Sequence, residues 1–293
     1  MGFSGALFGL LTFNVLNSIA LLLLLSIGLG VIYGMMKVIN LAHGEFVMLG
    51  AYTTVVCADA GLNIWLCMLV LAPLVCGVIG LVVERGLIRF LYGRMVDTML
   101  ATWGLSLALI GLITTIFGNN VRGVSNPLGG GFSIGPYQAS LYGVLVIVLA
   151  ITTCALIWAV LRYSRFGLIV RATMQNPDMA AALGVAPSLI YMVTFAAGSA
   201  LAGLAGGILA PISGVSPGMG AAFIAKAFIT VLGGGPAIIT GTGLASFLFG
   251  AISELASFAT TPVFGQVALL VAAIIMIRLL PQGITGRFLR RSV

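Results

Sequence analysis

Long apolar segments alternate with short polar segments along almost the whole chain. A helix needs about 20 apolar residues to cross a ~30 Å hydrocarbon layer, and this spacing recurs several times. The apolar runs are continuous, whereas strands of a membrane barrel alternate between apolar and polar positions. The pattern predicts an all-α, polytopic integral membrane protein, whose clearest spans are residues 16–36, 64–83, 98–117, 140–161, 191–210, 238–258 and 263–280.

Two further apolar segments are interrupted. Residues 40–57 begin with polar side chains, and residues 221–232 are short and lie between glycine- and proline-containing turns. Non-helical backbone at membrane depth is tolerated only where protein or a water-filled cavity covers it, and broken helices often build transporter sites. We therefore expect eight or nine transmembrane segments with broken helices. Residues 40–52 and 216–230 also share a weak internal repeat.

Charge and composition support a membrane protein. Hydrophobic residues make up 61% of the 293 positions and charged residues only 6%. The net charge of +7 does not indicate nucleic-acid binding, because the basic residues gather in alternate loops, as in cytoplasmic loops of membrane proteins. The rule places residues 84–94, 162–171 and the C-terminal end inside and residues 118–138 outside, which predicts a multi-pass protein of the bacterial inner membrane.

Other features add no separate domain or cofactor. Residues 1–293 have no linker and are expected to form one transmembrane domain, and the first residues lack the basic region of a cleavable signal. The chain contains no GxxxxGK[ST] phosphate-binding loop. The cysteines lie in apolar runs without metal-ligand spacing and are expected to act as small hydrophobic residues: Cys57, Cys67, Cys76 and Cys154.

A polar cluster at residues 34–52 is the main candidate site. Asn40, the only histidine, His43, and Glu45 stand within six residues of one another in an apolar segment. Intramembrane ionisable groups are expensive and usually functional. A proton relay, direct substrate contact and a structural role at a helix break remain open, whereas one histidine and one carboxylate supply too few ligands for a closed zinc site. No second histidine is present to complete a catalytic triad.

Three further residues are candidates for the translocation path. Lys226 lies in the second interrupted segment and Glu254 in a late span, where pairing would lower the insertion cost of both charges. Trp103 is either a path-lining residue or a packing residue, since aromatic side chains also serve as interface anchors.

The loop at residues 162–187 predicts a short cytoplasmic helix. Asn176 suits an N-cap, Pro177 the first helical position, and Asp178 the positive end of the helix dipole. An alanine-rich run follows, and Gly184 suits the position just past the helix end.

At this loop a resemblance becomes specific. Residues 33–52 (YGMMKVINLAHGEFVMLGAY), 165–185 (RFGLIVRATMQNPDMAAALGV) and 279–288 (LLPQGITGRF) resemble the permease subunit of branched-chain amino acid ABC importers, a family that includes urea and short-chain amide permeases. The resemblance extends over essentially the whole chain. It implies that the cytoplasmic helix couples to an ATPase subunit through Asn176, Pro177, Asp178, Ala180, Ala181, Leu183 and Gly184.

The resemblance also implies the partners. These are ABC ATPase subunits that bind ATP and Mg²⁺, a second permease subunit, a periplasmic solute-binding protein and the lipid bilayer; this chain itself would hold no cofactor and would not be an enzyme. The substrate is open between branched-chain or related amino acids and urea or short-chain amides, and residues 101–104 (ATWG) resemble the urea branch. A stand-alone proton-coupled transporter and, more remotely, an intramembrane enzyme are the alternatives.

Overall fold

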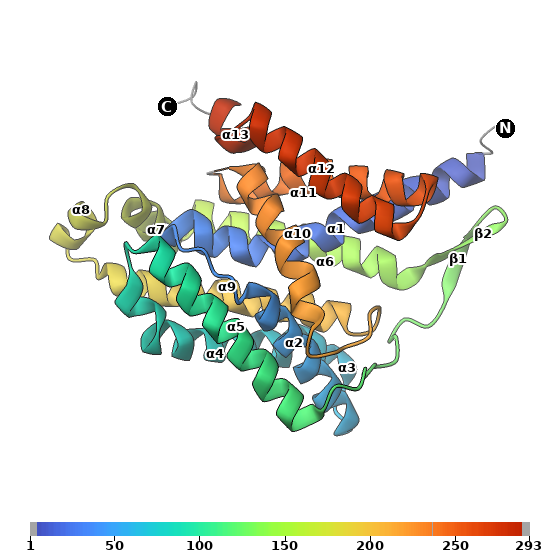
Figure 1. Ribbon diagram of the computed structural model, residues 1–293, viewed down its shortest axis with the longest axis horizontal. Helices are drawn as coiled ribbons and strands as arrows, with labels where there is room; N and C mark the ends of the chain where they lie inside the picture. Colours follow the sequence, from blue (N-terminus) through green and yellow to red (C-terminus); the bar gives the residue numbers. More distant parts are fainter. Residues whose placement is uncertain (1–4, 236, 289–293) are drawn as a thin grey trace.

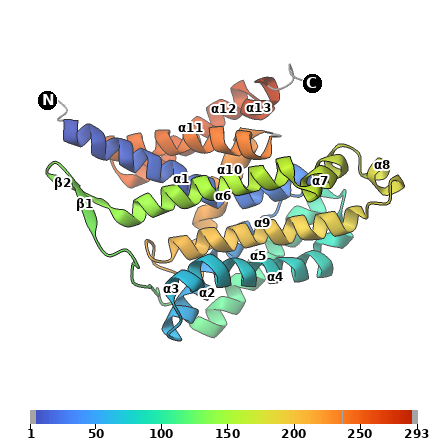
Figure 2. The same ribbon diagram turned by 180° about the vertical axis from the view of Figure 1, so that it is seen from behind.

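Seven long helices of the computed structural model confirm the predicted class (Figures 1 and 2). The structure describes residues 5–235 and 237–288. In these residues the helices that are long and apolar enough to cross a membrane are α1 (Gly5–Met36), the segment Ile64–Gly86, α5 (Met95–Phe117), α6 (Leu141–Tyr163), α9 (Pro187–Leu209), α11 (Ile238–Ala259) and α12 (Pro262–Leu279). The segment Ile64–Gly86 contains α3 (Ile64–Leu66), a π-helical turn (Cys67–Leu71) and α4 (Ala72–Gly86).

Two shorter helices account for the interrupted segments. α2 (His43–Asp59) has 17 residues and α10 (Met219–Gly234) has 16, so each is about 25 Å long at a rise of 1.5 Å per residue. Residues 37–42 between α1 and α2 are not helical. With α2 and α10 each counted as one crossing, the chain crosses nine times, which agrees with the expected eight or nine segments.

The two ends of the bundle differ in charge. At one end lie α7 (Arg165–Gln175), α8 (Pro177–Ala182) and α13 (Gly283–Phe288), together with the loop between α4 and α5 (Figure 1). This end carries Arg85, Arg89, Arg94, Arg162, Arg165, Arg171 and Arg278, and by the positive-inside rule it is cytoplasmic. The start of α1 lies at the opposite, outer end.

A β-hairpin covers the outer end. β1 (Gly131–Ile134) and β2 (Tyr137–Ser140) pair antiparallel, with Gly131 opposite Ser140. Phe132 packs edge-on against Phe13 of α1, with ring centroids 5.6 Å apart. The segment 118–138 was predicted to lie outside, without any strand assigned to it; each strand has only four residues, too few to stand out in the sequence.

Reciprocal packing relates the two halves of the chain. α1 lies along α11, and α9 lies along α4. α9 runs in the opposite direction to α1 (Figure 2). α1 and α9 meet at Gly28 and Gly198, where a Cβ on Gly28 would lie 2.5 Å from the Gly198 carbonyl oxygen. α2 and α10 meet at Gly44 and Gly220. These reciprocal contacts fit an inverted repeat, and the weak sequence repeat falls at the start of α2 and α10.

Equivalent glycines extend this relationship. Gly80 of α4 packs against Ser199 of α9, and Gly250 of α11 packs against Ile19 of α1. Each of these two glycines is followed four residues later by a glutamate, Glu84 or Glu254. Small residues at such crossings allow helix backbones to approach closely in a membrane.

Candidate functional sites

The helix break before α2 is held by polar contacts to neighbouring backbone. Asn40 Oδ1 accepts a hydrogen bond from the amide of Ala42 at 3.1 Å. His43 Nε2 lies 2.9 Å from the carbonyl oxygen of Leu25 in α1. Because Asn40 and His43 are each only 1% exposed, these contacts satisfy groups that water cannot reach.

Helix α5 forms hydrogen bonds to the other side of the break. The amide of Leu41 donates to Thr102 Oγ1 at 3.1 Å, and the Ser106 side chain hydrogen-bonds to the carboxyl group of Glu45. Glu45 is 2% exposed and stands in the first turn of α2, where the helix dipole favours a negative group. The structure therefore brings the three predicted residues Asn40, His43 and Glu45 together, at the break.

Part of this cluster has no protein partner. Among the described residues, Asn40 Nδ2, His43 Nδ1 and Glu45 Oε2 are buried without a hydrogen bond. Thr102 and Ser106, which the sequence analysis missed, supply the contacts from α5. Their spacing of four residues on one helix face was the available signal, but hydroxyl residues are too common in this chain for it to stand out.

Trp103 lies apart from the cluster. It follows Thr102 on α5, but its side chain is 56% exposed, whereas Thr102 is buried against the break. Successive helix residues are about 100° apart around the axis, so Trp103 faces the outside of this chain. Its role in the path stays a prediction.

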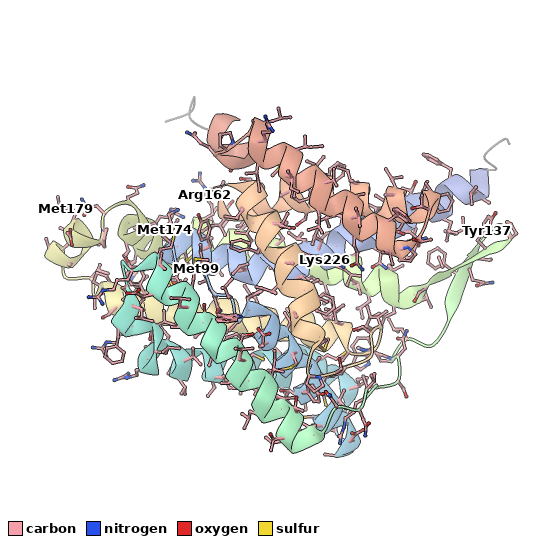
Figure 3. The ribbon with its side chains drawn as sticks, viewed as in Figure 1. Met99, Tyr137, Arg162, Met174, Met179 and Lys226 are labelled. Carbon is pink, nitrogen blue, oxygen red and sulfur yellow. The ribbon has the colours of Figure 1, made fainter. Side chains whose placement is uncertain are left out.

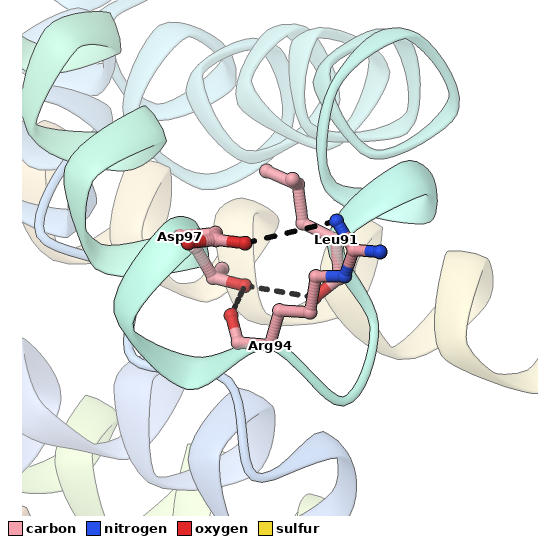
Figure 4. A network of polar contacts seen from close by, with 4 residues as sticks. Leu91, Arg94 and Asp97 are labelled. Carbon is pink, nitrogen blue, oxygen red and sulfur yellow. Dashed lines mark hydrogen bonds and ion pairs between the residues drawn. The ribbon is translucent and has the colours of Figure 1, made fainter.

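Lys226 and Glu254 do not form the expected pair. The ion pairs in the described part of the chain are Arg94–Asp97 at 3.8 Å and Arg122–Asp59 at 3.9 Å, and the first is drawn in Figure 4. Lys226 instead lines a cavity whose α11 wall includes Ser253. Glu254 is the next residue along α11 and is turned away by about 100°, so the prediction of a Lys226–Glu254 pair is wrong in this conformation.

The predicted cytoplasmic helix is present as α8. Asn176 Oδ1 accepts from the Met179 amide at 3.0 Å, and Pro177 is the first residue of the helix. At its other end, Gly184 has a φ of +87°. The amides of Gly184 and Val185 bond back to the carbonyls of Ala181 and Ala180 at 3.0 and 3.1 Å, which is a Schellman motif.

Helix α8 projects from the inner end of the bundle. Figure 3 places Met179 at its extremity, and the side chains of Met179 and Leu183 are 59% and 78% exposed. Besides Leu183, five residues of the predicted coupling set are exposed: Asn176, Pro177, Asp178, Ala181 and Gly184. Ala180 is 3% exposed and packs inward. Met179 was missing from the predicted set, since exposure on so short a helix cannot be read from composition.

Tyr92 connects the loop after α4 to α4 and α9. The Tyr92 hydroxyl donates to Glu84, and its ring lies edge-on to Tyr191, with centroids 5.1 Å apart. Burial, followed by the hydrogen bond to Glu84, holds the pKa of Tyr92 well above its usual range. Tyr92 therefore stays a neutral hydrogen-bond donor.

These features define a multi-pass membrane protein: a bundle of spanning and broken helices with a capped, exposed helix at its cytoplasmic end. The chain belongs to the family described as the permease component of the branched-chain amino acid transport system, whose model matches residues 11–280. No solved structure shows a significant match to the chain.

Named relatives agree with this family. The chain is 26% identical to the high-affinity branched-chain amino acid transport permease LivH of Salmonella typhimurium, over 90% of this chain and 91% of that one. It is 26% identical to the probable LivH of Methanocaldococcus jannaschii, over 91% and 89%. It is 27% identical to BraD of Pseudomonas aeruginosa, over 90% and 91%.

Proposed function

We propose that this chain is the transmembrane permease subunit of an ATP-driven importer for branched-chain or related amino acids. The family match over most of the chain and the names of its relatives support this proposal. Its expected partners are separate ATPase subunits that bind ATP and Mg²⁺, a second permease subunit and a periplasmic binding protein.

Helix α8 is the observation that carries the coupling part of the proposal. Six residues are too few for a stable isolated helix, yet α8 is capped at both ends and exposes Met179 and Leu183 away from the bundle. An exposed apolar tip on a rigid, capped helix is suited to insertion into a partner surface. The chain has no phosphate-binding loop of its own, so the nucleotide would be bound by that partner.

Movement of α8 would pass directly to the spanning helices. α8 is followed after Gly184 by α9, which packs against α1, α2 and α4. A push on α8 would therefore shift α9 relative to the break at residues 37–42. We propose that ATP-driven closure of the ATPase subunits switches the path between outward-open and inward-open states in this way, because such a switch requires different partner contacts in the two states.

The polar cluster takes a structural role in this proposal. The contacts of Asn40 and His43 run to backbone groups and that of Glu45 to Ser106. They hold the end of the broken helix, at the point where α1, α2 and α5 meet. A proton relay remains the alternative for His43 and Glu45, and it is tested below.

The test is uptake of labelled leucine by membrane vesicles that contain this chain and its co-expressed partners, with and without ATP. We expect ATP-dependent leucine uptake that urea does not compete. Uptake only of labelled urea would place the chain in the amide branch, and leucine uptake indifferent to ATP would favour a stand-alone transporter.

Two variants test the coupling helix. Ala181→Arg and Leu183→Glu place charge on the exposed face of α8 and should abolish co-purification of the ATPase subunit and ATP-driven uptake. Phe90→Glu, at a 71% exposed site in the other inner loop, is the matched control and should retain both. Intact assembly and uptake in Ala181→Arg would show that α8 is not the docking element.

A further inference from the structure

A cavity of about 140 Å³ lies between α1, α10, α11 and α12. Its polar groups are Lys226, Ser18 and Ser253, and its apolar walls include Leu22, Phe223 and Leu269. α1 and α11 form one side, where they cross at Gly250: a Cβ there would lie 2.8 Å from the Cα of Ile19.

The cavity adjoins the helix break at membrane depth. Leu25 lines it, and the carbonyl of the same residue contacts His43 at 2.9 Å. Leu209, the last residue of α9, lines it as well. A solute in this cavity would therefore touch both α10 and the end of α9, the helix that continues from α8.

Lys226 brings an ammonium group into this cavity without a carboxylate partner. No acidic side chain in the described part of the chain pairs with it. A lysine ammonium has three hydrogen-bond donors and no acceptor, and a charge inside a membrane protein marks a functional site by default. In Figure 3 Lys226 is labelled on α10, near the middle of the molecule.

The combination fits an aliphatic carboxylate. Apolar cavities of about 150 Å³ in proteins hold a benzene molecule, so this cavity, at about 140 Å³, is large enough for a branched side chain of three or four carbon atoms. The hydroxyl groups of Ser18 and Ser253 can donate to a carboxylate at the same site. An uncharged solute such as urea would leave the apolar walls unused and the ammonium unpaired.

We propose that Lys226 binds the carboxylate of the transported amino acid. The aliphatic side chain of that amino acid then lies against Leu22, Phe223 and Leu269. The inference rests on the proposed function, since it names the substrate contact within that permease. It assigns to Lys226 direct contact with the substrate in the path.

The test is binding of tritiated leucine to the assembled complex in nanodiscs of uncharged lipid, without the binding protein. We expect Lys226→Met to weaken binding by about 10- to 100-fold, the range for loss of a hydrogen bond to a charged group, and Lys226→Arg to retain most of it. Arg278→Met removes an exposed positive charge at the end of α12, outside the cavity, and should bind like the unmodified complex.

Competition on the unmodified complex gives a readout that does not depend on variant folding. 4-Methylpentanoate keeps the carboxylate and should displace leucine, whereas 3-methylbutylamine keeps only the ammonium and should not. Wild-type affinity in Lys226→Met, or displacement by the amine as strong as by the carboxylate, would overturn the proposal. ATP-driven leucine uptake by the unmodified system is measured in parallel, so a failure of the proposed function is seen separately from a failure of this site.

Discussion

Gly44 at the start of α2 and Gly220 at the start of α10 face each other so closely that neither position has room for a side chain. A Cβ on Gly220 would lie 2.7 Å from the carbonyl carbon of Gly44, and a Cβ on Gly44 would collide with the Gly220 carbonyl. Backbone, unlike the end of a flexible side chain, cannot move aside. The close approach of α2 and α10 therefore requires glycine at both positions.

Gly44→Ala and Gly220→Ala should each destabilise the protein by about 1–3 kcal/mol, the usual effect of overpacking. The expected readout is a lower melting temperature of the purified protein in detergent. Gly104→Ala is the matched control, because a Cβ at Gly104 in α5 meets nothing within 4 Å and alanine is the better helix former. A melting temperature of Gly44→Ala equal to that of the unmodified protein would mean that α2 and α10 can separate freely.

His43 provides a test between a structural role and a proton relay. His43→Leu removes the hydrogen bond that the Leu25 carbonyl accepts in addition to its bond within α1, which should cost about 0.5–1.5 kcal/mol of stability. His43→Gln keeps a donor and should keep more of that stability. In vesicles, an imposed pH gradient without ATP should drive no uptake in the unmodified protein. Uptake driven by the gradient and lost in both His43 variants would instead establish proton coupling.

The spans and the capped helix were predictable because their signals are local. The continuous apolar runs predicted most ends of the long helices to within a few residues of the observed ends. The exception is α1, which begins at Gly5 and not near residue 16. Asn176, Pro177 and Gly184 specify α8 through the chemistry of their own positions. In each case the residues that carry the signal are neighbours along the chain.

The parts that sequence reasoning missed depend on contacts between distant segments. Ser106 meets Glu45 only because α5 crosses the break, and Lys226 faces a cavity rather than Glu254 because of the rotation of α11 relative to α10. Neither the crossing of α5 nor the rotation of α11 can be read from a local sequence pattern. The same holds for the paired glycines: glycine is common in membrane helices, and the pairing of Gly28 with Gly198 is visible only in the structure.

The caps of α8 should control its stability independently of any partner. Asn176→Ala removes the side-chain acceptor for the Met179 amide and should cost about 1 kcal/mol, as at other N-caps, while Asn176→Asp should be nearly neutral. Gly184→Ala forces a Cβ into left-handed backbone and should cost a similar amount. Hydrogen exchange of the backbone amides at residues 179–185 should become faster in Asn176→Ala and in Gly184→Ala, but not in Asn176→Asp. Unchanged exchange in both would show that α8 is held by packing and not by its caps.

The ion pair at the outer end should contribute little by itself. Asp59 and Arg122 approach to 3.9 Å with side chains 63% and 41% exposed, and exposed pairs of this kind typically contribute about 0–1 kcal/mol. The backbone of Arg122, however, exchanges two hydrogen bonds with Val215, at 2.9 and 2.8 Å, and these join the loop after α5 to the loop before α10. Asp59→Asn should therefore leave the melting temperature nearly unchanged. Val215→Pro, which removes the Val215 amide donor, should lower it clearly and loosen the outer end of α10. If Asp59→Asn were the more damaging of the two changes, the side-chain pair and not the backbone bridge would hold these loops together.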